Sequence, residues 1–172
     1  MNISTLTQMV NRVLVSILIL FMGLMVLTVI WQVFTRFIIN DPSVFTDELS
    51  RYLLIWIGIL GGAYTFSVKR HLALELLASR LSYKRKQLQS IFINILIIVF
   101  TYISLVYGGS QYALTTIAHQ QVSPGLSIGE YKLLIGYVYM VIPISGVLII
   151  FYGLLDILES FKNINSNMSG EE

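Results

Sequence analysis

Four long stretches without a charged side chain are the feature that most limits what this chain can fold into. Residues 13–35 and 133–155 each run for 23 residues without Asp, Glu, Lys or Arg, residues 52–68 for 17, and residues 87–118 for 32. A helix of about 20 residues crosses the hydrocarbon core of a bilayer, whereas a helix at the surface of a soluble protein carries a polar face along its length. We therefore predict an all-α membrane protein with four transmembrane helices, over residues 12–37, 43–68, 86–118 and 131–158 of a single domain that covers residues 1–162.

The composition of the chain agrees with a lipid environment. Hydrophobic residues make up 56% of the 172 residues and charged residues only 12%, about half the charged share of a typical soluble domain. The chain has no cysteine, so no disulfide framework and no thiol chemistry are expected. After the last span, residues 163–172 are polar and are expected to form a disordered tail.

The longest uncharged stretch could in principle hold two spans. Two crossings and a turn need more than about 40 residues, and the only break signal in this stretch is Gly108-Gly109-Ser110. We therefore expect one long helix that tilts or projects from the membrane.

The basic residues predict the orientation of the spans. Eight of them lie before the first span, between the second and third spans, or after the last span, and three lie in the other two connections. By the positive-inside rule, the connection between the second and third spans and both termini are cytoplasmic. Since topology accounts for these residues, the net charge of +2 does not indicate nucleic-acid binding.

The connection between the second and third spans has a pattern of its own. Polar residues recur at helical spacing over residues 71–82, and leucines and an alanine line another face. About three turns are too short to cross a bilayer, so we expect a short amphipathic helix in the cytoplasmic interface. The basic anchor Lys84-Arg85-Lys86 follows it. His71 and Glu75 lie one turn apart and could hydrogen-bond, but two ligands are too few for a metal site.

A charged cluster is expected where the second span begins. Asp41 can cap that helix and Pro42 can occupy its first position. The next turns carry a group of charged side chains within reach of one another, to which the end of the first span adds a natural partner: Asp47, Glu48, Arg51 and Arg36. This group is either a solvated ion-pair cluster at the headgroups or a buried contact that fixes helices or a partner subunit, because the short uncharged stretch draws it toward the lipid.

Three glycines lie further along the second span. Gly58, Gly61 and Gly62 leave flat patches where another helix can approach closely. The sequence leaves open whether that helix belongs to this chain or to a partner.

No constellation of catalytic, cofactor or metal-binding residues is visible. The chain has no H-E-x-x-H and no phosphate-binding loop, and its two histidines fall on opposite sides of the membrane, which disfavours a bis-histidine haem. No span core contains an acidic or basic residue, so no transport site of its own is expected. A self-sufficient exporter of the small multidrug type remains the alternative, although such proteins use a membrane-embedded Glu in the first helix, which this chain lacks.

One stretch of the sequence is similar to a known family. The run Asp47-Glu48-Leu49-Ser50-Arg51-Tyr52, a glycine at Gly61 or Gly62, and the spacing of His71 and Glu75 resemble the signature of the small membrane subunit, Q-type and DctQ-like, of tripartite ATP-independent periplasmic (TRAP) transporters. Arg36 and Pro143 also fit. The chain departs from the family pattern at Phe45-Thr46, where a Trp is common, and at Glu75, where Asp is more usual.

The resemblance implies a set of partners in a bacterial inner membrane. A large membrane subunit would hold the substrate and sodium sites and move as an elevator, and a soluble periplasmic protein would deliver a carboxylate such as sialic acid or a dicarboxylate. This chain would brace the large subunit, would not be an enzyme and would hold no cofactor.

Overall fold

The computed structural model describes residues 3–78, 83–126 and 133–168, and within them four long helices cross the molecule, as the uncharged stretches predict. The first is α1 (Ile3–Phe34), which ends in a π-helical turn, η1 (Thr35–Ile39). The second is α2 (Val44–Ala78). The third runs without a break through α3 (Tyr83–Thr101), the π-helical η2 (Tyr102–Gly108) and α4 (Gly109–Ala118), and the fourth consists of α5 (Ile135–Tyr139) and α6 (Val141–Met168). Gly108 and Gly109 therefore do not divide the third helix.

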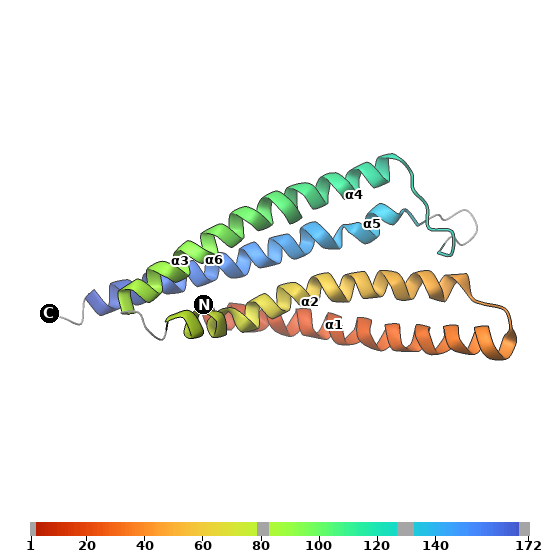
Figure 1. Ribbon diagram of the computed structural model, residues 1–172, viewed down its shortest axis with the longest axis horizontal. Coiled ribbons are helices and arrows are strands. Elements are labelled where there is room, and N and C mark those ends of the chain that lie inside the picture. Colours follow the sequence, from red (N-terminus) through yellow and green to blue (C-terminus); the bar gives the residue numbers. More distant parts are fainter. Residues whose placement is uncertain (1–2, 79–82, 127–132, 169–172) are drawn as a thin grey trace.

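The helices form two hairpins that lie side by side (Figure 1). One consists of α1 and α2, the other of α3, η2 and α4 with α5 and α6, and α2 and α6 form the main contact between the hairpins. Leu14, Leu60 and Val141 form a buried core at this contact. Both chain termini lie at one end of the bundle, called here the terminal end, and the hairpins diverge toward the opposite end, called here the turn end.

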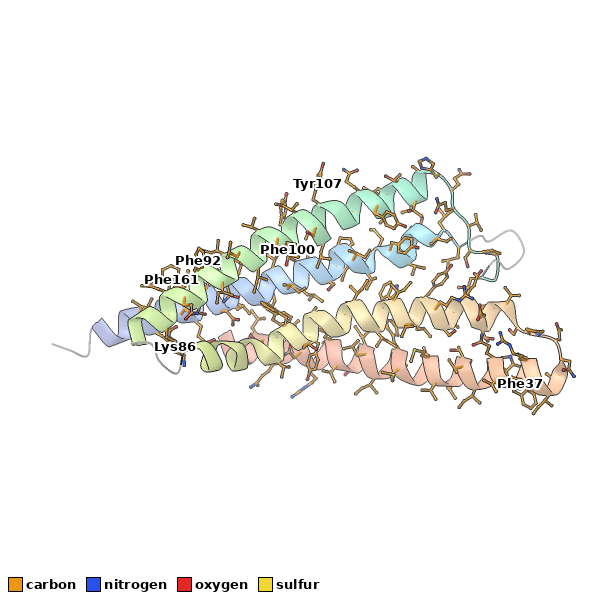
Figure 2. The ribbon with its side chains drawn as sticks, viewed as in Figure 1. Phe37, Lys86, Phe92, Phe100, Tyr107 and Phe161 are labelled. Carbon is orange, nitrogen blue, oxygen red and sulfur yellow. The ribbon has the colours of Figure 1, made fainter. Side chains whose placement is uncertain are left out.

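Most large apolar side chains of the spans point away from the protein. Phe92, Phe100 and Tyr107 project outward from α3 and η2 (Figure 2) and are more than half exposed. The candidate spans are long and apolar enough to cross a membrane, at Thr5–Ile39, Val44–Val68, Lys86–Ala118 and Ile135–Ile164. An apolar exterior of this kind matches a lipid solvent, in which exposed hydrocarbon carries no penalty.

Proline divides the fourth helix. Pro143 has no N–H for the carbonyl of Tyr139, four residues earlier, and its ring excludes that carbonyl from the helical position. The helix accordingly breaks at Met140 into α5 and α6. Gly109 lies against this break: a Cβ there would lie 2.6 Å from Ile142 Cγ2.

Three boundaries differ from the sequence-based expectations. Ser43, not Asp41, caps α2, because its hydroxyl accepts the Thr46 N–H at 3.5 Å and its carbonyl accepts the Asp47 N–H at 3.2 Å. Residues 71–78 are helical, but they continue α2 and do not form a separate interfacial helix; residues 79–82 lie outside the described part. The tail expected to be disordered is helical as far as Met168, because α6 continues into it, and residues 169–172 are not described.

Candidate functional site

The turn end holds the charged cluster, and α1 reaches it through Gln32. The Gln32 side-chain amide donates a hydrogen bond to Asp47 of α2. Thr35, one turn further along, is buried, and its carbonyl and hydroxyl accept the backbone N–H groups of Asp41 at 3.1 Å and Ser43 at 3.4 Å. Together these bonds fix the turn between the first two helices and the alignment of α1 with α2.

Arg36 is not part of this contact. It lies one residue after Thr35, so its side chain points to another side of the helix and is exposed. Gln32, three residues before Thr35, lies on the same face as Thr35 and takes the place expected for Arg36. Within the described residues, no ion pair of Arg36 is found.

Asp47 and Arg51 form an ion pair on the outer side of α2. An Arg51 guanidinium nitrogen lies 2.5 Å from Asp47 Oδ2, across one helical turn. The Arg51 side chain is nevertheless 70% exposed and the Asp47 side chain 32%. Asp47 also accepts the Gln32 amide of α1, so only the Arg51 side of the pair faces away from the rest of the chain.

Glu48 turns in another direction and joins the two hairpins. Its Oε2 accepts hydrogen bonds from the Ser123 hydroxyl and, at 3.0 Å, from the Gly125 N–H, both in the connection after α4. Gly125 sits so close to α2 that a Cβ there would lie 2.7 Å from the carbonyl oxygen of Val44. Only glycine fits this approach, and the approach brings the Gly125 N–H to the carboxylate.

The three glycines of α2 meet nothing within the described chain. A Cβ built on Gly58, Gly61 or Gly62 has no heavy atom within 4 Å outside its own helix. The sequence left open whether these glycines contact a helix of this chain or of a partner. In the structure they make no close contact with another described helix.

A polar seam along α6 is the feature that sequence reasoning missed. Near the terminal end, Asn11 of α1 accepts hydrogen bonds from the Ser67 hydroxyl of α2 at 2.9 Å and the Tyr152 hydroxyl of α6 at 2.7 Å. Ser145 donates to the Ile59 carbonyl of α2 at 3.0 Å. These serine and tyrosine side chains are not among the site residues predicted from the sequence. Their helical spacing on α6 was the available signal.

Asp156 belongs to the same seam. It is 5% exposed and follows Tyr152 by one turn on α6. The contact between Tyr152 and Asn11 places Asp156 about one turn further toward the terminal end than Asn11, level with the start of the first span. An acid at this level does not supply the mid-membrane carboxylate that an exporter of the small multidrug type would need.

The polar groups predicted for the connection after α2 are only partly visible. The backbones of His71 and Glu75 lie in α2, and those of Lys84 and Arg85 in α3, but their side chains lie outside the described part of the chain. Lys86 is half-buried near the terminal end (Figure 2). Among the described residues no cluster of three metal-ligating side chains occurs.

Two hollows lie between the hairpins on either side of the edge-to-face pair of Phe21 and Trp56, whose ring centroids are 5.7 Å apart. The larger, of about 440 Å³, lies toward the terminal end between α1, α2 and α6, and the smaller, of about 210 Å³, lies toward the turn end. Neither is lined by a charged residue, and the larger is lined only by apolar and aromatic side chains.

Comparisons with known proteins agree on one family. Residues 25–163 match the model of tripartite ATP-independent periplasmic transporters, DctQ component. The sialic acid TRAP transporter small permease protein SiaQ of Vibrio cholerae is 26% identical over 144 residues, which cover 82% of each chain. A TRAP transporter small permease protein of Haemophilus influenzae is 31% identical over 77 residues, which cover 45% of this chain and about half, 48%, of that protein.

Proposed function

Because the chain belongs to the family of DctQ components of TRAP transporters, which are transporter subunits and not enzymes, we propose that it is the small scaffold subunit of a sodium-coupled TRAP transporter. It braces a large membrane subunit that holds the substrate and sodium sites, while a periplasmic binding protein delivers the cargo. The cargo is a carboxylate of the sialic acid or dicarboxylate class. The name of the Vibrio cholerae relative, a sialic acid transporter protein, supports this cargo class.

The observation that carries the scaffold role is the apolar character of the two hollows. A bound carboxylate needs cationic or N–H donors. The larger hollow is lined by aliphatic and aromatic side chains such as Leu14, Leu60 and Trp56, and Tyr52 brings the one hydroxyl among the residues around the smaller. Glu48 and Asn11, two polar groups at contacts between helices, already hold neighbouring segments through hydrogen bonds. Such an interior suits a brace, and in the described part of the chain these two hollows offer no charged donor to a carboxylate.

Reconstitution tests this role. Proteoliposomes with this chain alone should show no sodium-dependent uptake of labelled sialic acid or of a four-carbon dicarboxylate. Proteoliposomes with the large subunit, this chain and the periplasmic protein should take up one of them. Uptake by this chain alone would contradict the scaffold role.

The proposed orientation places the terminal end in the cytoplasm, as the positive-inside rule indicates. Reporter domains fused after Arg85 and after Lys162 should both give a cytoplasmic signal. A periplasmic signal from either fusion would overturn the orientation.

A further inference from the structure

Beyond the hydrogen bond from Gln32 to Asp47 at its turn end, one face of α2 packs against no helix of the described chain, although its residues are spaced as in a helix contact. The positions follow one another at alternating steps of four and three residues, which is the 3.5-residue period of a helix seam: Asp47, Arg51, Leu54, Gly58, Gly61, Thr65 and Val68. Each is exposed or half-exposed. The seam is charged at the turn end, glycine-rich at its middle and apolar at the terminal end.

The depth of Arg51 shows that lipid alone is a poor cover for this face. The contacts Gln32–Asp47 and Asn11–Ser67 align α1 with α2 and place Arg51 beside Thr28. Arg36, where the uncharged stretch of α1 ends, lies about eight residues or 12 Å further toward the turn end. The exposed Arg51 side chain therefore lies beside apolar α1 residues that face the hydrocarbon.

The length of α2 leads to the same conclusion independently. Only the 17 residues 52–68 separate Arg51 from the next charged residue, and they span about 25 Å, less than a hydrocarbon core of about 30 Å. A charged group at that depth is costly unless protein or water surrounds it. The Asp47 carboxylate contacts one guanidinium nitrogen, and the remaining donors are open to acceptors from another chain.

We propose that this seam docks a membrane helix of the large TRAP subunit, which places small residues against Gly58 and Gly61 and a carboxylate or carbonyl acceptor opposite Arg51. The inference rests on the proposed function, because it takes the partner from there. A second copy of this chain is a poorer occupant. Two parallel copies joined along the seam would bring Arg51 against Arg51 at the same depth, and like charges repel.

The test compares two open glycines. Gly58→Leu fills the seam, and Gly23→Leu, on α1, is the matched control because a Cβ at either position meets nothing within 4 Å. With the wild-type chain as bait in mild detergent, the large subunit should co-purify. Gly58→Leu should reduce its recovery about tenfold, equivalent to ~1.4 kcal/mol, and Gly23→Leu should leave recovery unchanged.

The possible results separate the two proposals. If the wild-type chain recovers no large subunit, the proposed function fails. If it does and Gly58→Leu recovers as much as Gly23→Leu, the docking face is wrong.

A labelling measurement does not depend on how the leucine variants fold. The chain has no cysteine, so Leu54→Cys and the control Leu27→Cys each carry a single thiol at a position that is exposed in the isolated chain. A lipophilic maleimide should label Leu54→Cys about tenfold more slowly in the complex than in the isolated chain, while Leu27→Cys labels equally in both. Equal rates at Leu54→Cys, or an oxidative crosslink between two copies of Leu54→Cys within the complex, would overturn the inference.

Discussion

The fourth and second spans use the same kinds of residue in opposite ways. In α5 and α6, glycines and polar side chains turn inward: Gly136, Gly146 and Gly153 lie against neighbouring helices, and Ser145 and Tyr152 hydrogen-bond to them. In α2, three glycines and an arginine face outward and meet no other helix in the described chain. Small residues allow close helix approach in both spans. The contrast indicates that α6 organises the chain itself, while α2 is shaped for something outside it.

The largest expected effect is at a glycine of the fourth span. Gly136→Ala adds a Cβ 2.7 Å from the Ala113 carbonyl oxygen and 3.0 Å from the Ile117 nitrogen, both backbone atoms of α4. Because backbone must shift, we expect a loss of stability of about 1–3 kcal/mol, measured as a lower melting temperature of the purified chain. An unchanged melting temperature would show that α4 and α5 are not held this closely.

Glu48 sharpens the comparison because its carboxylate reaches from α2 to the other hairpin. Glu48→Gln removes the charge that the Ser123 hydroxyl and the Gly125 N–H meet. We expect the free energy of unfolding of the isolated chain to fall by about 1–2 kcal/mol. The control is Asp41→Asn, which changes an exposed acid. In the assembled transporter, the substrate concentration for half-maximal uptake should stay nearly unchanged. A change of that concentration with full stability would place Glu48 in a ligand site.

Tyr152→Phe removes one hydroxyl and tests the hydrogen bonds that α6 makes with its neighbours. The variant removes the hydrogen bond to Asn11 but leaves Asn11 bonded to Ser67. Hydrogen bonds between membrane helices average about 0.6 kcal/mol, with a maximum near 1.7, so a small decrease of the unfolding free energy in detergent titration is expected. Ser16→Ala, which removes an exposed hydroxyl of α1, should have no comparable effect.

The smallest loss of stability is expected at an open glycine of α2, where alanine should cause none. In Gly62→Ala the added Cβ has no heavy atom within 4 Å outside its own helix. Alanine stabilises a helix by up to about 1 kcal/mol relative to glycine. The isolated chain should therefore keep or slightly raise its melting temperature. A clear drop would mean that the glycines of α2 serve contacts inside the chain, and the contrast between the two spans would disappear.

The sequence predicts the helices of this chain better than the faces that they present. Charge-free length alone fixes four spans, because the cost of a charge in lipid does not depend on which helices meet. The partner of Asp47 could not be deduced in the same way: the choice of Gln32 over Arg36 depends on where Thr35 is buried in the turn. Likewise, the glycines of α2 have the same spacing whether they face a neighbour or open space, and only the tertiary arrangement decides.

Asp156 shows a second limit of sequence reasoning. The uncharged stretch 133–155 ends just before Asp156, and the predicted span 131–158 includes Asp156 without giving it an inward role. In the structure that residue is buried beside Tyr152 and Ser160 on the inward face of α6. The helical spacing of the polar residues, more than the charge count, carried this information.

The π-helical segment η2 has a consequence for anyone who shortens, splices or aligns this chain. A π-turn accommodates an additional residue within an α-helix. The residues that face inward before Tyr102 and those that face inward after Gly108 are therefore not related by regular α-helical spacing. Deleting one residue within η2 would return it to a regular α-helix and keep the two inward faces aligned. Deleting one residue of the regular helix α3 would instead rotate everything after it by about 100°. Gly109, Ala113 and Thr116 would then turn toward the lipid, and bulkier side chains would meet the break at Pro143.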